Sequence, residues 1–206
     1  MQTCPPGVNR ARMLPIERAS QETGAVNGGD VTEGGSVPTL SSATKFPQTV
    51  TPEGRRIEER IDGVVTRQSV THPDERGTLC EIFNPAWDLS EEPLVYVYQI
   101  TIRPGQVKGF VLHKTYSDRL FFSFGTVKVV LYDDREASPT RGMLNELHFS
   151  EHNRGNLVIP PGVWHAVKNV GDTDSMMVNC PTKPYNHEDP DKWALPRDSD
   201  LIPYRF

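Results

Sequence analysis

The sequence has few cysteines and no long apolar segment. Its three cysteines are an odd number, lie far apart and form no CxxC pair, which indicates reduced thiols rather than a disulfide framework or a zinc site. No apolar run approaches the roughly 18 residues that a membrane-spanning helix needs, and the N-terminus lacks the apolar core of a signal peptide. We therefore expect a cytoplasmic protein that does not associate with membranes.

An excess of basic charge is also missing. The chain has 22 Lys and Arg against 27 Asp and Glu, for a net charge of -5. Proteins that bind nucleic acids present a basic surface, so this balance predicts no nucleic-acid partner. The 206 residues are enough for one domain with an additional tail.

Residues 1–55 differ in composition from the rest of the chain. They are rich in Gly, Ser, Thr, Pro and Glu and contain few large apolar residues. Such a segment cannot bury enough surface to offset the entropy lost on ordering. We therefore expect a disordered or loosely attached arm, with the alternative that part of it pairs with a partner subunit.

Residues 56–206 read as one all-β domain. Short runs rich in Val, Ile, Phe, Tyr and Thr, such as VYVYQITI and TVKVVLY, alternate in hydrophobicity and are separated by turn signals every ten residues or so. No helical segment of ten or more residues interrupts them. Many short strands at this spacing indicate a sandwich or a barrel, with room for one ligand-sized cavity.

A histidine follows a tight turn in the segment GNLVIPPGVWHAVKN (155–169). A buried strand meets a Pro-Pro-Gly reversal, so His165 should begin the next strand at a cavity rim and face inward. The segment resembles the second cupin motif, PxGxxHxxxN, and implies a cupin jelly-roll β-barrel. A core histidine that is hydrogen-bonded to the backbone is the alternative.

A second histidine lies in the run KGFVLHK (108–114). Strand alternation places Val111 and His113 on one face. A metal-binding cupin would carry HxH here, followed by a glutamate. Valine occupies the first histidine position and Asp118 is a doubtful replacement for the glutamate. Two histidines without a placed carboxylate make a weak metal site, and we expect neither a metal nor another cofactor.

A third signal is the segment DERGTLCEIF (74–83). The guanidinium of Arg76 suits a phosphate, and Glu81 can accept a hydrogen bond from a sugar hydroxyl or a base N–H. From the spacing of these residues alone, a hairpin with a surface ion pair is the better explanation of the segment.

Together these segments resemble the dTDP-4-dehydrorhamnose 3,5-epimerase family. DERGTLCEIF, YQITIRPGQVKGF, VVLYDDREASPTRG and LVIPPGVWHAV occur in the order and spacing of that family, over about Gly63 to Phe206. The resemblance implies a homodimeric cupin that binds a nucleotide-linked 4-keto sugar and needs no cofactor. It implies that Arg76 and Glu81 hold the diphosphate, often from the neighbouring subunit, and that Gln99 contacts the base. Lys108 stands where the family has an arginine near the phosphates.

The chain departs from the family at the catalytic positions. An epimerase needs a base on one face of the sugar carbon, a donor at the keto oxygen and an acid on the other face. Counted from Lys108-Gly109, the family's base histidine is replaced by Val111. The family's tyrosine falls at Val178 or Asn179. The sequence thus resembles a divergent member of the family that lacks the base histidine and the acid tyrosine.

The remaining residues suggest a rearranged site. We predict His113 as the base, because it shares a strand face with position 111. Arg119, at the family's lysine position, would polarise the keto oxygen, and His165 would orient or assist. Lys114 and Asn179 are further candidates for substrate binding.

The predicted function is a sugar-nucleotide epimerase or isomerase acting on a dTDP-4-keto-6-deoxyhexose in deoxysugar or polysaccharide biosynthesis. One strong base fits a single epimerisation or a keto shift better than a double epimerisation. The alternatives are a non-catalytic cupin that binds a nucleotide sugar and a metal-dependent cupin enzyme. The Pro-rich tail from Pro181 should wrap the barrel through Trp193, Tyr204 and Phe206, and packing explains Tyr185 and His187 adequately, although a functional role for them is open.

Overall fold

The computed structural model describes residues 40–54, 56–197 and 199–206. The chain divides into two units, Met1–Pro47 and Gln48–Phe206. The described part of the first unit holds a single turn of 3-10 helix, η1 (Leu40–Ser42). Most of the arm predicted over residues 1–55 lies outside the described residues, so its disorder stays a prediction.

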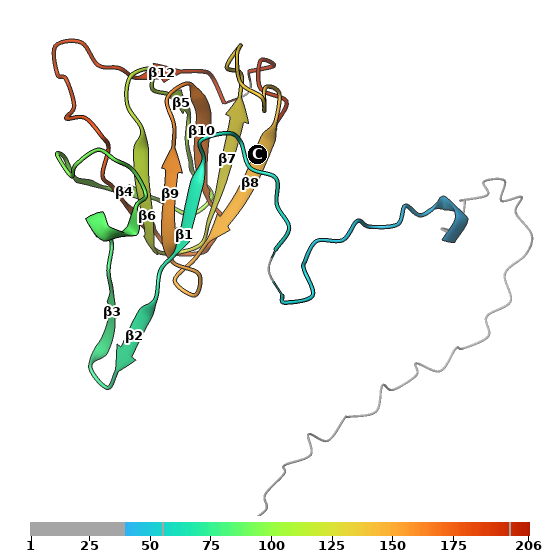
Figure 1. Cartoon of the computed structure of the whole chain (residues 1–206), viewed down its shortest axis with the longest axis horizontal. Helices are drawn as coiled ribbons and strands as arrows, with labels where there is room; N and C mark the ends of the chain where they lie inside the picture. The colour runs from blue at the N-terminus through green and yellow to red at the C-terminus, as the bar shows by residue number, and fades with distance from the viewer. Residues whose placement is uncertain (1–39, 55, 198) are drawn as a thin grey trace, which may run out of the picture. The chain divides into compact units, whose positions relative to one another are not determined.

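The second unit is built from two five-stranded antiparallel sheets (Figure 1). The first sheet has the order β1-β9-β6-β11-β4, and the second has the order β12-β5-β10-β7-β8. The strands of the first sheet are β1 (Val65–Gln68), β9 (Gly155–Ile159), β6 (Asp118–Phe124), β11 (Ser175–Asn179) and β4 (Tyr98–Ile102). Those of the second are β12 (Trp193–Ala194), β5 (Val107–Leu112), β10 (Val163–Asn169), β7 (Val127–Asp133) and β8 (Leu144–Phe149).

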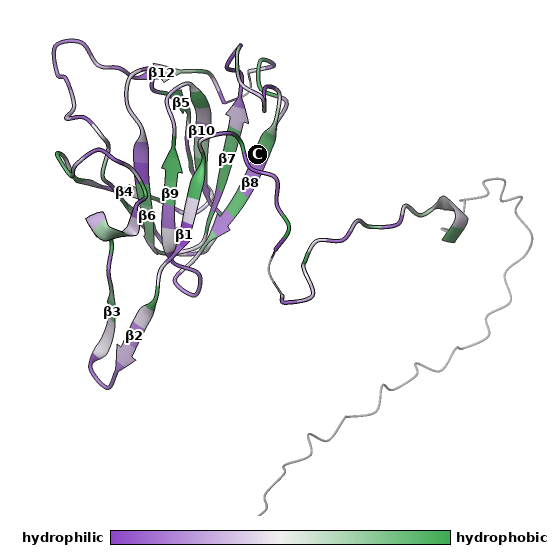
Figure 2. Ribbon diagram, viewed as in Figure 1, coloured by the Kyte–Doolittle hydropathy of each residue, from purple (hydrophilic) through white to green (hydrophobic). Residues whose placement is uncertain are grey.

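The main hydrophobic core lies between these sheets. Buried and less buried residues alternate along β11, as expected for a strand that turns one face inward. In β7 and β10 only the second and sixth residues are less buried, because Val130 and Ala166 on their outer face are covered by a second buried cluster. Phe122 of β6 stacks on Phe149 of β8 with ring centroids 4.1 Å apart. Figure 2 shows the hydrophobic residues concentrated in the strands of the two sheets. Each fully buried large apolar side chain contributes about 1.5–3 kcal/mol.

The predicted all-β cupin jelly roll is confirmed. In the described part of the chain the two sheets face each other as separate layers rather than closing into one continuous barrel. The helical content of the described residues is limited to η1 and η2 (Pro85–Trp87), each a short 3-10 turn. Within those residues, no helix is long and apolar enough to cross a membrane.

A close backbone contact joins β5 to β10 next to the two histidines. A Cβ at Gly109, where φ is +121°, would lie 2.6 Å from the Cα of Ala166 and from the carbonyl oxygen of His165. The register of the β5–β10 pair shifts between His165 and Val167. Such bulges re-aim side chains and are frequent beside active sites. A residue with a side chain at position 109 would therefore displace the strand that carries His165.

The C-terminal segment begins at Pro181, and its last residues (199–206) cover the outer face of the second sheet. There, Phe110, Val130, Ala166 and Ile202 form a smaller buried cluster, against which Tyr204 and Phe206 pack. Trp193 is instead half exposed, and the Lys114 ammonium lies 3.7 Å from its ring centroid. The segment thus uses its last residues as apolar contacts, whereas Trp193 stacks with a lysine.

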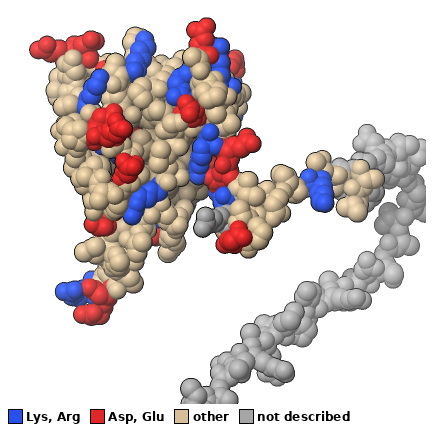
Figure 3. Space-filling view, in the orientation of Figure 1, with Lys and Arg blue, Asp and Glu red and all other residues tan. Residues whose placement is uncertain are grey.

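A short hairpin stands apart from both sheets. Strands β2 (Thr71–Asp74) and β3 (Gly77–Cys80) pair only with each other and project away from the body (Figure 1). The side chain of Leu79 is 63% exposed. Basic and acidic side chains meet at the tip of the hairpin (Figure 3), where Arg76 lies 2.7 Å from Asp74.

Candidate active site

A cavity of about 770 Å³ lies between the two sheets. Both sheets and the C-terminal segment 185–192 contribute to its lining. Its polar lining includes three histidines, one carboxylate, two amides, two lysines and several tyrosines, among them His113, Asp118, His165, Asn179, Tyr98 and Tyr116. This volume is in the usual range for a small-molecule site, and the side chains in it favour acid–base chemistry.

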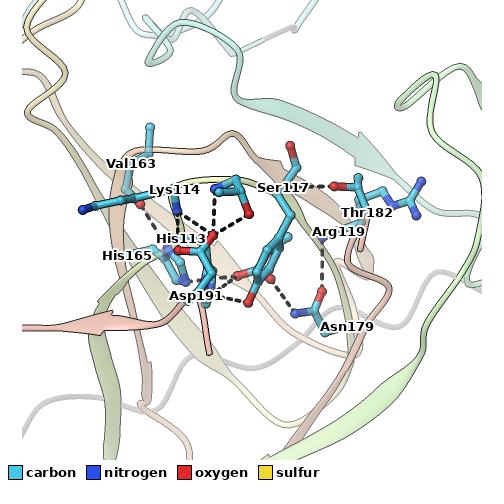
Figure 4. A network of polar contacts seen from close by, with 12 residues as sticks. His113, Lys114, Ser117, Arg119, Val163, His165, Asn179, Thr182 and Asp191 are labelled. Atoms are coloured by element: carbon cyan, nitrogen blue, oxygen red, sulfur yellow. Dashed lines mark hydrogen bonds and ion pairs between the residues drawn. The ribbon is translucent and has the colours of Figure 1, made fainter. Parts of the chain in front are cut away.

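One buried carboxylate holds two imidazoles (Figure 4). The Oδ2 atom of Asp118 lies 3.1 Å from Nε2 of His165 and 3.4 Å from Nε2 of His113. The exposed fractions of the three residues are 4%, 6% and 8%. Asp118 begins β6 in the first sheet, whereas His113 follows β5 and His165 lies in β10, both in the second sheet. The carboxylate therefore bridges the two layers at the cavity.

Backbone carbonyls determine which nitrogen of each imidazole carries a hydrogen. Nδ1 of His113 lies 2.5 Å from the carbonyl oxygen of Asp191, and Nδ1 of His165 lies 3.1 Å from that of Val163. A carbonyl oxygen can only accept, so each Nδ1 carries a hydrogen. Each Nε2 is then the atom that exchanges a proton, and both point at the carboxylate of Asp118.

The cluster shifts the pKa values of its members in opposite directions. Burial alone would raise the pKa of Asp118, but the hydrogen bonds from His113 and His165 hold it far below its usual value. Burial likewise lowers the pKa of His113, yet the hydrogen bond and the charge of Asp118 outweigh this and raise it above 6.5. Asp118 therefore stays ionised, and His113 titrates above the pH at which a free imidazole does.

An amide connects this cluster to a tyrosine. Nδ2 of Asn179 donates to Oδ1 of Asp118 at 2.7 Å and to the hydroxyl oxygen of Tyr98 at 2.8 Å. Its Oδ1 accepts from the backbone N–H of Arg119 at 3.2 Å, which assigns the amide orientation. Burial, together with the charge of Asp118, raises the pKa of Tyr98 to about 12.

Another tyrosine lies directly on His113. The ring of Tyr116 stacks on the imidazole with centroids 4.3 Å apart. Its hydroxyl lies 3.5 Å from Nε2 of His113, at the limit of a hydrogen bond. Burial raises the pKa of Tyr116 above its ordinary value, so this phenol is protonated at neutral pH.

The C-terminal segment is attached beside His113 through Asp191. Its carboxylate accepts hydrogen bonds from the backbone N–H groups of Lys114 and Thr115, from the Thr115 hydroxyl and from the indole of Trp193. These bonds hold the pKa of Asp191 below its usual value against the effect of partial burial. Figure 4 shows Asp191 beside His113 and Lys114.

Five of the predicted site residues line the cavity: Gln99, Lys108, His113, His165 and Asn179. The hydrogen bond from His165 to the backbone was the alternative reading of that residue. It is present, and the same ring also faces the cavity.

The guanidinium of Arg119 does not line the cavity. Its Nε donates to the carbonyl oxygen of Cys180 at 2.6 Å, and its Nη atoms donate to those of Glu92 at 2.7 Å and Pro93 at 2.9 Å. Successive strand residues point to opposite faces, so Arg119 turns outward where Asp118 turns inward. This placement gives no support to Arg119 as the donor to a keto oxygen.

Three other predicted residues also lie outside the cavity lining. Arg76 and Glu81 belong to the β2–β3 hairpin and its exit, and both are exposed. Lys114 is exposed over Trp193. Within the described part of this single chain, none of the three contributes to the 770 Å³ cavity.

Asp118 was not predicted from the sequence as a partner of the histidines, and Tyr98 was not predicted as a site residue. A signal for both existed. Alternation along DRLFFSF places Asp118 on the face opposite Arg119, and alternation in VYVYQITI places Tyr98 on the same face as Ile100. The pairing of Tyr98 with Asn179 could not be read, because it depends on the register of strands about 80 residues apart.

The same cluster has the donor set of a metal site. One ligand atom each from His113, Asp118 and His165 lie within 4.8 Å of one another. Two imidazoles and a carboxylate suit a divalent transition metal, and each Nδ1–H is held by a carbonyl as in metal-bound histidines. We expected no metal partly because no carboxylate was placed beside the two histidines. That premise was wrong, because Asp118 lies between the two histidines.

The fold is a cupin jelly roll whose cavity holds a buried cluster of two histidines and one carboxylate between its sheets. Residues 58–201 match the family model described as dTDP-4-dehydrorhamnose 3,5-epimerase. The chain belongs to the dTDP-4-dehydrorhamnose 3,5-epimerase family.

Relatives agree with this assignment. The "Probable low-salt glycan biosynthesis epimerase Agl13" of Haloferax volcanii is 39% identical over 140 residues, which are 67% of this chain and 89% of Agl13. The spore coat polysaccharide biosynthesis protein SpsL of Bacillus subtilis is 33% identical over 146 residues, 71% and 96% of the two chains. The crystal structure of a dTDP sugar isomerase from Desulfovibrio desulfuricans G20 superposes with a TM-score of 0.66 at 27% identity, covering 70% of this chain and 90% of that one.

Proposed function

We propose that this protein epimerises a carbon next to the ketone of a dTDP-4-keto-6-deoxyhexose, in the biosynthesis of a deoxysugar or polysaccharide. Family membership supports an epimerase. The names of Agl13 and SpsL support a glycan or polysaccharide pathway. The structural similarity to a dTDP sugar isomerase supports dTDP as the nucleotide of the substrate. The single observation that carries the proposal is the pair of imidazoles held by Asp118 inside the cavity.

The chemistry begins with removal of the proton on the carbon next to the ketone. Such a proton is acidic only when the developing enolate is stabilised. His113 is the proposed base: its Nδ1 is held by a carbonyl, and its Nε2 makes only long contacts, 3.4 Å to Asp118 and 3.5 Å to Tyr116. Asp118 then stabilises the imidazolium that forms. His165, on the other side of the same carboxylate, assists by sharing the proton.

The enolate oxygen needs a positive donor in the cavity. Arg119 is engaged with backbone carbonyls, so we assign this role to the lysines that line the cavity, Lys108 on β5 and Lys192 on the C-terminal segment. A lysine places a compact charge with three donors next to the oxygen. This electrostatic contribution is frequently the largest in enolate chemistry.

Incubation with dTDP-4-keto-6-deoxyglucose in D₂O tests the proposal. The wild-type protein should introduce deuterium next to the ketone and form an epimer, which NMR detects. His113→Ala should slow the exchange about 100-fold or more, as expected for loss of a general base. His152→Ala, which removes an exposed histidine from a surface turn, is the matched control and should leave the rate unchanged. Absence of exchange and of any isomer with the wild-type protein would contradict the proposal for this substrate.

A metal-dependent cupin is the second candidate, favoured by the His113–Asp118–His165 donor set. Elemental analysis of the purified protein decides between the two. About one equivalent of a transition metal per chain, lost in Asp118→Ala, would support the metal-dependent reading. A non-catalytic sugar-binding cupin would instead bind dTDP tightly and show no exchange.

A further inference from the structure

Asn179 lies on the strand between the two strands that carry Tyr98 and Asp118. In the first sheet, β11 pairs with β4 on one side and with β6 on the other. Asn179 is the last residue of β11, lies directly opposite Tyr98 and is 1% exposed. A short side chain at this position can therefore reach the neighbouring strand on each side.

Each polar atom of this amide is engaged within the protein. The two hydrogens on Nδ2 go to Oδ1 of Asp118 at 2.7 Å and to the Tyr98 hydroxyl oxygen at 2.8 Å. The amide oxygen accepts from the backbone N–H of Arg119 at 3.2 Å (Figure 4). A side-chain amide has only two N–H donors, so both are already used without a ligand. These bonds direct Asn179 to Asp118 rather than to a substrate.

The bond from Asn179 determines which oxygen of Asp118 faces the imidazoles. Oδ1 is occupied by the amide, whereas Oδ2 lies 3.1 Å from Nε2 of His165 and 3.4 Å from Nε2 of His113. The terminal torsion of an aspartate is broad, so a carboxylate without such a partner turns easily. Because one oxygen is held from within the first sheet, the other is directed at the second sheet, which carries both histidines.

We propose that Asn179 is a positioning residue for the base: it holds the Asp118 carboxylate in the orientation that presents Oδ2 to His113 and His165. This inference rests on the proposed function, in which His113 removes the substrate proton. Asn179 neither gives nor takes a proton. It acts through Asp118, which stabilises the imidazolium that this step forms.

Asn179→Ala separates a positioning role from a role in substrate binding. If the amide positions Asp118, kcat should fall about 10- to 100-fold, as for a catalytic group displaced by about 1 Å, while KM and the Kd for dTDP stay within about twofold. An amide that binds the substrate would instead raise KM with kcat retained. That result would overturn the proposal.

The titration of His113, followed by NMR, gives a readout that needs no substrate. The groups that face this imidazole are the Asp118 carboxylate, the His165 imidazole, the Tyr116 hydroxyl, and the carbonyl and carboxylate of Asp191. Burial lowers the pKa of His113, and the hydrogen bond and charge of Asp118 raise it to a net value above 6.5. A carboxylate that has lost its orientation should raise this pKa less. The midpoint should therefore move to lower pH in Asn179→Ala.

The sign of this change is decisive. If the amide only weakened the charge of the carboxylate, its removal would strengthen the pull of Asp118 on the proton and move the His113 midpoint to higher pH. A midpoint that rises or stays in place would thus overturn the positioning role.

Asn179→Asp keeps the shape of the side chain and makes the positioning bond depend on pH. It places a carboxyl group against the Asp118 carboxylate, the Tyr98 hydroxyl and the backbone N–H of Arg119. When protonated, this carboxyl can donate to Asp118; when ionised, it puts a like charge beside it. Turnover should therefore fall as pH rises, along a basic limb at lower pH than any in the wild type. A profile without that limb would contradict the proposal.

Asn145→Asp is the matched control. The amide of Asn145 also joins backbone groups, the N–H of Ile61 and the carbonyl of Glu59, but the residue does not line the 770 Å³ cavity. This variant should keep the wild-type kcat and pH profile.

This proposal and the proposed function fail in different ways. If the wild-type protein neither exchanges nor inverts the substrate, the epimerase proposal falls, and the NMR midpoint of His113 still decides the role of Asn179. If the wild type is an epimerase and Asn179→Ala matches its kcat, the positioning role falls and the epimerase proposal stands. Should the melting temperature show that Asn179→Ala is unfolded, the pH profile of Asn179→Asp decides.

Discussion

At the scale of single residues, the site is organised by the two oxygens of Asp118. Oδ2 faces both imidazoles and Oδ1 accepts from Asn179, so the carboxylate connects the base side of the cavity to Tyr98. An unpaired carboxylate with 4% exposure would be strongly disfavoured. The hydrogen bonds that surround it are therefore a condition for its burial, and removal of any one of them is felt by the others.

The pH dependence of turnover follows from the groups that face His113. These are the Asp118 carboxylate, the His165 imidazole, the Tyr116 hydroxyl and the Asp191 carbonyl. A base must be neutral to act, and the pKa of His113 is raised above 6.5. Activity should therefore rise with pH along an acidic limb whose midpoint lies above 6.5. Replacement Asp118→Asn should move that midpoint to lower pH and reduce kcat about tenfold or more.

A pH profile of kcat/KM for the wild type and for Asp118→Asn checks this, with Asp172→Asn as the control. Asp172 is an exposed loop carboxylate, so its replacement should leave the limb in place. An acidic limb that stays at the same pH in Asp118→Asn would show that the carboxylate does not set the basicity of the site.

Part of this site could be predicted from the sequence. The turn before His165 and the shared strand face of positions 111 and 113 predicted two cavity histidines. Arg119 was predicted at the keto oxygen because it occupies the family's lysine position, and strand alternation, which turns Asp118 inward and Arg119 outward, was not applied there. The contact between His113 and Asp191 could not be predicted, because it is made by an irregular segment 78 residues away.

At the scale of elements, the approach of β5 to β10 determines where the histidines stand. The absent side chain of Gly109 lets the strands meet at the register shift beside His165. The alternating runs and turn signals predicted that these strands exist. They could not predict the shift, since it depends on packing between strands distant in sequence.

Gly109→Ala should be much more destabilising than Gly105→Ala. Both glycines have positive φ, but a Cβ at Gly105 would meet nothing within 4 Å. Gly105→Ala should therefore cost only the backbone strain of about 1–2 kcal/mol. Gly109→Ala adds a clash with Ala166, worth about a further 1–3 kcal/mol. Urea unfolding measures both; equal losses of stability would mean that the strands can separate there without cost.

At the scale of the whole molecule, the β2–β3 hairpin is separated from the chain's own cavity. It carries Arg76, with Glu81 directly after it, and neither lines that cavity. Homodimerisation, as the family resemblance implies, would give the hairpin a place at a neighbouring cavity. The projecting hairpin and its exposed Leu79 favour this arrangement, and we propose that the protein acts as a homodimer.

Complementation between two inactive variants tests this arrangement. Arg76→Ala and His113→Ala homodimers should each be impaired, the first through weaker dTDP binding. A heterodimer purified through two different tags would have one site with both lesions and one intact site. It should recover about half of the wild-type activity, as two-fold symmetry requires. Activity no higher than that of the Arg76→Ala homodimer would mean that each hairpin serves its own chain or no site at all.

The hydrogen bond between His113 and the Asp191 carbonyl has a thermodynamic consequence. The C-terminal segment and the proton on His113 share one contact, so each must influence the other by an equal free energy. An imidazolium is a stronger donor than a neutral imidazole, so protonation of the base tightens the segment over the cavity. The C-terminal segment should be held most firmly just after the proton has left the sugar, when exclusion of water matters most. It should loosen once the imidazole has lost that proton and the product can depart.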